Sequence, residues 1–242
     1  MPEAILRRAR VLIKRLLGLG LTARRVKKMY TEKEYLEAYS QHTDLRVDAD
    51  PHAAVGGLWE ELGKLQCDFL IQHGLRPHHT LLDIGCGTLR GGRHLIRYLD
   101  HGNYSGMDIS PKAIAYARQL VEQEGLAQKA PRLLVSSSRD LRFLEFAAET
   151  FDCVLAHSVF SQLKPEHIEE CFENVGRIMH DDSVFYFSYN DSPEFEQTGP
   201  KDFCQPSSFF ESLAEHYRFS LKDCSDQFNH PRGQRMIEVR KK

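Results

Sequence analysis

Cysteine pairs and long apolar runs are lacking in this 242-residue chain, and each absence speaks against a class of protein. The six cysteines include no C-x-x-C pair, which speaks against a zinc site or a secreted disulfide framework. No apolar stretch approaches the ~20 residues of a membrane-spanning helix, and no signal-peptide pattern is present. With 41% apolar residues, the chain is long enough for one full α/β domain. We therefore expect a cytoplasmic protein with reduced, buried thiols.

Two common nucleotide-binding fingerprints are also incomplete. The apolar run 81–84 leads into Gly85 and Gly87, and a helical pattern follows. The nicotinamide motif G-x-G-x-x-G needs glycine where this chain has Arg90, and no Gly-Lys-Ser/Thr completes a P-loop. The strand, turn and helix still predict a site where a nucleotide-like ligand lies against exposed backbone.

Two acids indicate the kind of ligand. Asp83 precedes the first glycine by two residues, which suits a ligand with a cationic end better than a pyrophosphate. Asp108 ends the next predicted strand, 103–107, and lies about 20 residues beyond the glycine turn. A carboxylate at that position accepts hydrogen bonds from both ribose hydroxyls.

Three segments, each one strand–helix unit apart, resemble the class I S-adenosylmethionine-dependent methyltransferases. They are Asp83–Gly87, Gly106–Ser110 and Phe151–Phe160. The resemblance covers roughly residues 55–240. It is closest to a bacterial small-molecule and glycan subgroup with Leu-Arg-Gly-Gly after the glycine turn and His-Pro-Arg-Gly-Gln near the C-terminus, here Leu89–Gly92 and His230–Gln234. The common family pattern has a third glycine at the position of Leu89.

The alternation of strand and helix patterns predicts a doubly wound α/β fold with a mostly parallel sheet. The predicted strands are 80–84, 103–107, 132–136, 152–156 and 183–189, and the predicted helices are 91–99, 111–123 and 165–179. The resemblance implies a seven-stranded Rossmann-like sheet finished by a C-terminal antiparallel hairpin, here 217–224 with 235–241. We divide the chain into a basic N-terminal helix, 1–29, and a methyltransferase domain, 30–242. The domain comprises a helical cap, 30–79, and an α/β core, 80–242.

The resemblance implies S-adenosyl-L-methionine as the cofactor. Backbone at the two glycines would approach its amino-acid end, with one acid near its ammonium and the other on the ribose. An apolar residue would lie on the adenine, a third acid near the adenine amino group, and an arginine near the cofactor carboxylate. The two glycines are Gly85 and Gly87, the acid near the ammonium is Asp83, and the acid on the ribose is Asp108. The apolar residue on the adenine is Ile109, the acid near the adenine amino group is Asp140, and the arginine is Arg90. The alternatives are a solvated surface carboxylate for Asp140 and a surface arginine for Arg90.

For catalysis we select His157, just past the fourth strand, as a general base toward a sugar or phenolic hydroxyl. The alternative is a histidine that only shapes the pocket, since methyl transfer assisted by proximity alone needs no base. Substrate contacts are expected from Tyr189 and from His230 and Arg232, in loops at the same edge. No metal site is expected.

The N-terminal segment differs in charge from the rest of the chain. Residues 1–28 carry nine basic side chains against Glu3 alone, while the whole chain has a formal charge of −2. Apolar and basic residues separate on a helical wheel, so residues 4–28 resemble a helix that binds an anionic membrane surface. Packing on the domain or a partner subunit, a transit peptide and nucleic-acid binding are the alternatives.

Together these features predict a methyltransferase for a small molecule or glycan, with O-methylation favoured and a membrane-peripheral, cytoplasmic location. Polysaccharide biosynthesis would fit such a location. A non-catalytic scaffold with the same fold is one alternative. A nucleic-acid methyltransferase is the less favoured one, because Ala156-His157-Ser158-Val159 stands where amino-directed base methylases carry an Asn/Asp-Pro-Pro-Tyr motif.

Overall fold

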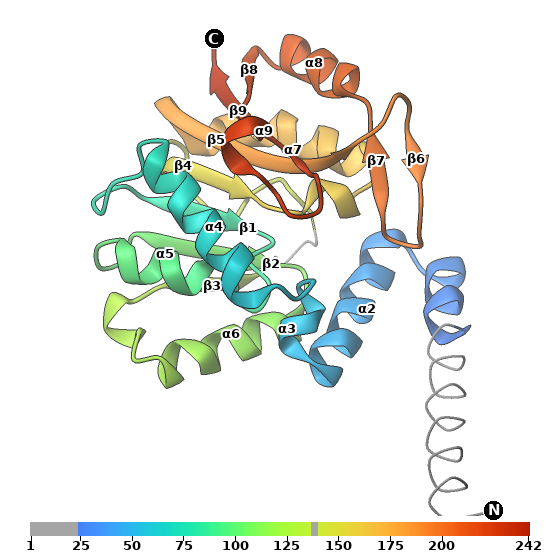
Figure 1. The fold of residues 1–242 in the computed structure, drawn as a ribbon, viewed down its shortest axis with the longest axis horizontal. Coiled ribbons are helices and arrows are strands. Elements are labelled where there is room, and N and C mark those ends of the chain that lie inside the picture. The colour runs from blue at the N-terminus through green and yellow to red at the C-terminus, as the bar shows by residue number, and fades with distance from the viewer. Residues whose placement is uncertain (1–23, 137–139) are drawn as a thin grey trace, which may run out of the picture.

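The computed structural model describes residues 24–136 and 140–242, and its central feature is a parallel sheet (Figure 1). Five strands pair in the parallel order β3-β2-β1-β4-β5. They are β1 (Leu81–Ile84), β2 (Tyr104–Asp108), β3 (Arg132–Val135), β4 (Phe151–Ala156) and β5 (Met179–Asp191). All four residues of β1 are buried, as expected of a central strand covered on both faces.

The C-terminal strands complete the sheet in antiparallel sense. β9 (Arg235–Lys241) pairs with β5 and with β8 (Phe219–Asp223), which confirms the predicted fold class. These seven strands match the expected sheet. Two short strands, β6 (Glu196–Gln197) and β7 (Phe203–Gln205), extend it from the end of β5, where the sequence indicated only an irregular stretch.

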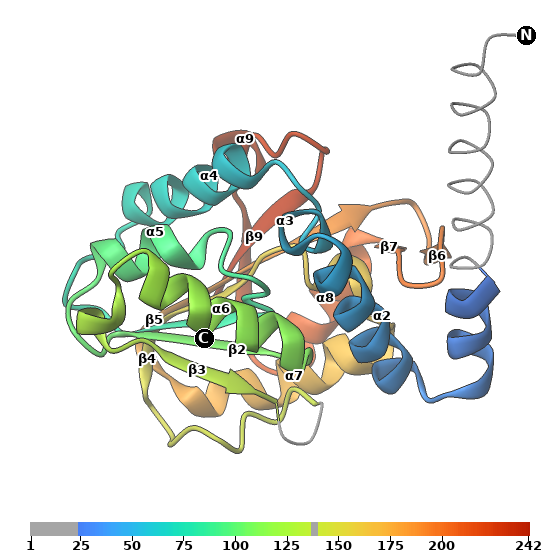
Figure 2. The same ribbon diagram turned by 90° about the horizontal axis from the view of Figure 1, so that it is seen from below.

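Helices cover both faces of the sheet (Figure 2). One core contains apolar side chains of α4 (Trp59–Gln72), α5 (Gly92–Tyr98) and α6 (Pro111–Gln123). The other contains those of α7 (Pro165–Ile178) and α8 (Ser207–His216). Shorter helical segments are α9 (Ser225–Phe228), which precedes β9, and the 3-10 turns η1 (Ala127–Lys129) and η2 (Phe160–Gln162).

The connection from β2 to α6 shows how local sequence places the site. Pro111 occupies the first turn of α6, where its missing N–H costs nothing, and the Ser110 hydroxyl accepts a hydrogen bond from the Ala113 N–H at 3.1 Å. The helix therefore begins at Pro111, three residues after Asp108. This holds the carboxylate at the carboxyl edge of the sheet, where doubly wound folds bind ligands.

The segment predicted as a helical cap contains α2 (Tyr35–Ala49), α3 (Pro51–Ala54) and α4. Its helices α2 and α3 lie beside the carboxyl edge of the sheet (Figure 1). Residues 24–32 are helical as well, while residues 1–23 of the predicted basic helix lie outside the described residues. Within the described part of the chain, no helix is both long and apolar enough to cross a membrane.

Candidate functional site

The turn after β1 brings bare backbone to the surface of a cavity. Gly85 and Gly87 have φ values of +66° and +55°, which favour glycine. A Cβ on Gly85 would lie 2.6 Å from Val159 Cγ2, and one on Gly87 would lie 2.5 Å from Val55 Cγ1. Both positions therefore exclude a side chain on conformational and steric grounds, and the backbone can approach a ligand closely.

Leu89, which replaces the family's third glycine, adopts the backbone conformation that glycine would favour. Its φ is +68°, and its side chain is fully buried. The left-handed conformation costs a non-glycine residue about 1–2 kcal/mol. The apolar packing of the leucine offsets that cost, so the turn keeps its geometry without the glycine.

The two predicted acids lie at the ends of the neighbouring strands β1 and β2. Asp108 accepts hydrogen bonds from the N–H groups of Gly87, at 2.9 Å, and Ser110, at 2.8 Å. Asp83 is buried and accepts a hydrogen bond from the Tyr104 hydroxyl at 2.7 Å. Burial raises the pKa of Asp83 to about 7 and that of Asp108 to about 6, although these hydrogen bonds favour the ionised forms. The site thus holds two carboxylates that a cationic or hydroxyl-bearing ligand would stabilise.

Both acids line one cavity together with the glycine turn, and the space between the lining atoms is about 1160 Å³, open solvent included. That is enough for a nucleoside-sized ligand. The cavity also contacts Ile109, Arg90, Asp140 and His157. All predicted cofactor-binding residues, and the predicted catalytic residue, are therefore brought together.

Helix α2 supplies one wall that the sequence analysis did not identify. Its contributing side chains are Leu36, Tyr39, Thr43 and Arg46. Their spacing of three, four and three residues is that of one helix face, which is the signal that could have found them. The Ser40 hydroxyl donates to the Ile109 carbonyl at 2.9 Å, and Asp44 accepts from the Ser110 hydroxyl at 2.5 Å. These bonds dock α2 on the end of β2.

At the end of the cavity expected to hold adenine, Ile109 and Leu141 line the wall beside Ser136 and Asp140. The Asp140 carboxylate is occupied by a salt bridge from Arg142, 2.5 Å from Nη2 to Oδ2. Its predicted role toward an adenine amino group therefore requires that the ligand share this carboxylate with the Arg142 guanidinium.

Arg90 and His157 form a buried polar pair. Arg90 donates from Nη1 to the carbonyls of Val55, at 2.6 Å, and Gly57, at 3.2 Å, and its Nη2 lies 3.2 Å from His157 Nδ1. The Gln66 amide also contacts that Nδ1. A guanidinium only donates hydrogen bonds, so Nδ1 is the acceptor and the imidazole proton resides on Nε2. Burial, and after it the nearby positive charge of Arg90, lowers the pKa of His157 well below its usual value. The ring is therefore neutral.

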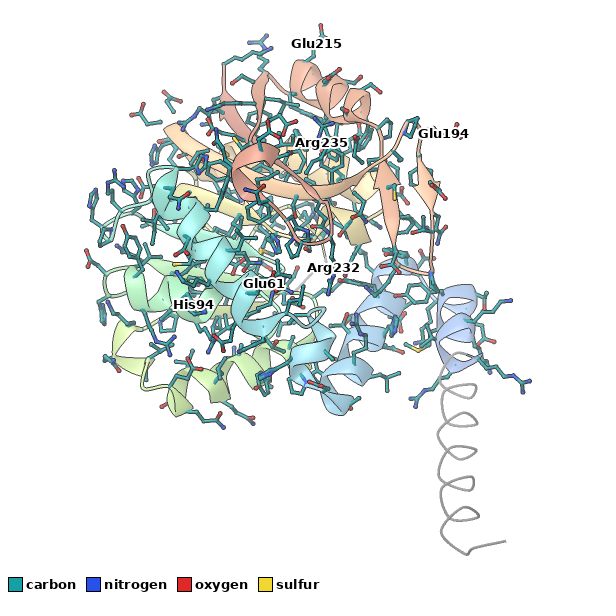
Figure 3. The ribbon with its side chains drawn as sticks, viewed as in Figure 1. Glu61, His94, Glu194, Glu215, Arg232 and Arg235 are labelled. Carbon is teal, nitrogen blue, oxygen red and sulfur yellow. The ribbon has the colours of Figure 1, made fainter. Side chains whose placement is uncertain are left out.

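The His-Pro-Arg-Gly-Gln motif forms the loop before β9. His230 is buried, and its Nδ1 accepts the N–H of Arg232 at 3.2 Å, which fixes the loop backbone. Arg232 donates to the Gly56 carbonyl, across to the α3–α4 connection (Figure 3). Gln234, which the sequence analysis did not select, accepts from the hydroxyls of Ser158 and Ser188, both at 2.9 Å. The motif thus links the C-terminal strand to the residues that follow β4.

Of the predicted substrate residues, Arg232 lines a second cavity beside the first, whereas Tyr189 lies in the core. The Tyr189 ring packs 4.4 Å, centroid to centroid, from Phe210 of α8. Strand alternation explains this, because Ser188 faces Gln234 and the next side chain must face the opposite side of the sheet. Among the described residues, no group of His, Cys, Asp and Glu side chains could hold a metal ion.

Comparison with known proteins agrees with this geometry. Residues 82–185 match the protein family described as "Methyltransferase domain". The chain has the Rossmann-like methyltransferase fold. Magnesium protoporphyrin IX methyltransferase (ChlM) from Synechocystis, solved with bound SAM, superposes with a TM-score of 0.64 at 15% identity, covering 87% of this chain and 98% of that one.

Two other solved structures show how widely the methyltransferase fold is used. A TehB-like SAM-dependent methyltransferase from Corynebacterium glutamicum has a TM-score of 0.57 at 20% identity, covering 85% of this chain and 99% of that one. The [4+2]-cyclase SpnF has a TM-score of 0.66 at 14% identity, covering 85% and 96%. Because a cyclase shares the methyltransferase fold, activity must be argued from the site.

Proposed function

We propose that the protein is an S-adenosyl-L-methionine-dependent methyltransferase that transfers the methyl group to a hydroxyl of a small molecule or glycan. The observation that carries the proposal is the convergence of Asp108, Asp83 and the Gly85–Gly87 backbone on one cavity. Asp108 is held by two backbone N–H groups and keeps lone pairs for ribose hydroxyls. The raised pKa of Asp83 means that a cationic ammonium beside it would favour its ionised form.

When bound, the cofactor would supply an activated methyl group on a sulfonium. The residues of this chain then hold and align the reactants, since methyl transfer is an in-line displacement that depends mainly on position. Bare backbone at the glycine turn allows close approach, and Arg90 provides a cation for the cofactor carboxylate. Helix α2 forms a wall of the same cavity.

His157 is proposed as the proton acceptor for the hydroxyl, under a condition that the geometry imposes. Its basic atom, Nδ1, is already contacted by the Gln66 amide and by the Arg90 guanidinium, so the histidine takes a proton only if both groups turn away. A substrate or cofactor carboxylate that binds Arg90 would produce such a movement of the guanidinium. Otherwise His157 orients Arg90 and shapes the pocket.

Calorimetric titration with S-adenosylhomocysteine tests the proposal, with Asp108→Ala as the variant and Asp226→Ala as the matched control. Asp226 is an exposed acid on α9 and does not line the cavity. We expect saturable binding that Asp108→Ala weakens at least tenfold, because a hydrogen bond to a charged group contributes about 1.5–3 kcal/mol. Folded protein without binding would refute the cofactor assignment and favour a non-catalytic scaffold.

The proposal includes a peripheral location at an anionic membrane, which rests on the sequence of residues 4–28 alone. Each basic side chain near such a surface contributes about 1 kcal/mol. The full chain should therefore co-sediment with anionic vesicles, and a chain that starts at Tyr30 should not. Equal sedimentation of both would refute the membrane location.

A further inference from the structure

A second cavity opens beside the proposed cofactor site. Five segments meet there: helix α2, the α3–α4 connection, the residues after β4, the end of β5 with the 198–202 loop, and the loop before β9. The two cavities share Arg46, Val55, Ser158 and Gln162 as lining residues. A molecule in the second cavity would therefore lie next to a molecule in the first.

The charge in this cavity is predominantly positive. Arg46, Lys201 and Arg232 line it, with Asp202 as the one acid among the described lining residues. Lys201 has only 10% of its side chain exposed, and its Nζ lies 3.6 Å from Asp202, whose side chain is 51% exposed. Within the described residues, no carboxylate lies at ion-pair distance from Arg46 or Arg232. Two positive charges thus remain without a counter-charge.

The hydrogen bonds of the cavity point to the same kind of ligand. Two of the neutral donors are already used: Asn190 donates to the Phe203 carbonyl at 3.2 Å, and Ser161 donates to the Ser158 carbonyl at 3.1 Å. Arg46, by contrast, uses Nη2 for the Ala53 carbonyl at 2.7 Å and has further N–H groups free. The Arg46 guanidinium therefore provides unused cationic donor capacity in the cavity.

The described lining contains no aromatic side chain on which a sugar ring or a phenolic ring could stack. Its apolar part is limited to Ala53, Val55 and two glycines. This differs from the mostly apolar lining of a typical small-molecule site. The cavity is thus suited to a charged group of the acceptor rather than to its carbon skeleton.

We propose that this second cavity binds a phosphoryl group of the methyl acceptor through Arg46, Lys201 and Arg232. A phosphate monoester carries about 1.5–2 negative charges at neutral pH, which matches the uncompensated positive charge. Arginine is favoured for such groups because its planar fork donates two parallel hydrogen bonds. That the phosphoryl group belongs to the methyl acceptor rests on the proposed methyl transfer. Anion binding to the cavity can be measured independently of that transfer.

The test is calorimetric titration of the full-length protein with inorganic phosphate, with and without saturating S-adenosylhomocysteine. The variants are Lys201→Gln and Arg232→Gln. Arg118→Gln is the matched control, because Arg118 is an exposed arginine on α6 that also donates to a backbone carbonyl, that of Leu133 at 2.9 Å. We expect saturable phosphate binding that persists with the nucleoside present. Each site variant should weaken it about tenfold or more, and the control should change it less than twofold.

Absence of saturable phosphate binding, or equal binding by the site variants and Arg118→Gln, would overturn the proposal. Displacement of phosphate by S-adenosylhomocysteine would place the anion in the first cavity and overturn it as well. If acetate bound more tightly than phosphate, the cavity would be a site for a carboxylate, and the proposed phosphoryl group would be refuted. If a variant unfolds, the two wild-type titrations still decide between these outcomes. Phosphate binding without nucleoside binding would refute the methyl transfer while leaving the anion site.

Discussion

Replacing Asp83 by asparagine should make the ligand-free protein less sensitive to alkaline pH. The pKa of Asp83 is raised from 3.8 to about 7 by burial, so the folded state holds its proton over a range where the unfolded chain has lost it. Between those two values the folded state binds more protons, and its stability falls as the pH rises. An asparagine at this position cannot ionise, so this contribution disappears.

The magnitude follows from the size of the shift. Each pKa unit corresponds to 1.36 kcal/mol. Because the folded-state pKa lies about two units above pH 5, the free energy of unfolding of the wild type falls by about 3 kcal/mol between pH 5 and pH 8. The hydrogen bond from the Tyr104 hydroxyl survives, because the asparagine oxygen still accepts it. The new amide N–H groups add a constant penalty that does not depend on pH. The difference in pH dependence therefore isolates the carboxylate.

The assay is urea unfolding of both proteins at pH 5 and pH 8 without ligand. We expect the wild type to lose about 3 kcal/mol more than Asp83→Asn over this interval. Asp108 titrates in both proteins and largely cancels in the comparison. Equal pH dependence of the two proteins would refute the argument, because Asp83 would then be ionised in the folded state at both pH values.

Two further substitutions test the catalytic residue and the glycine turn. His157→Asn keeps an acceptor for Arg90 but cannot take a proton, so a general base at this position predicts a loss of kcat of about a hundredfold or more with cofactor affinity nearly unchanged. An unchanged kcat would leave His157 as a residue that orients Arg90. At Leu89, Leu89→Ala should cost about 2–5 kcal/mol of unfolding free energy through the lost packing. Leu89→Gly should be about 1 kcal/mol more stable than Leu89→Ala, because its φ of +68° favours glycine, and the opposite order in urea unfolding would contradict the strain.

The sequence was sufficient to predict the parts of the site that local pattern controls. Asp83 and Asp108 end strands that are adjacent in a parallel sheet, and the glycines between them require a tight turn, so their proximity follows from topology. The strand and helix positions followed from periodicity in the same way. The strands, the glycine turn and the two acids beside it were thus predictable without knowledge of long-range packing.

The remainder depends on contacts between distant segments. Gln66 reaches His157 from α4, and the Arg232 loop meets Gly56, 176 residues away in sequence. Lys201 enters the second cavity from a loop that local patterns left unassigned. Tyr189 lies in the core and lines neither cavity, because a shift of one residue along a strand moves a side chain to the other face of the sheet. Its substrate contact stays a prediction.

The position of α2 has a consequence for the rate at which a ligand leaves. The helix is bonded at one side to the backbone after β2, through Ser40 and Asp44, and at the other to the segment after β4, through Tyr35 and Gln162. It therefore bridges the two halves of the sheet edge above the cavity. Local opening of this helix would remove one wall of the cavity, so the residence time of a bound nucleoside should fall when α2 is less firmly attached. The segment that precedes α2 in the chain is the basic one, so a force or a binding partner acting there would change that residence time without touching the ligand.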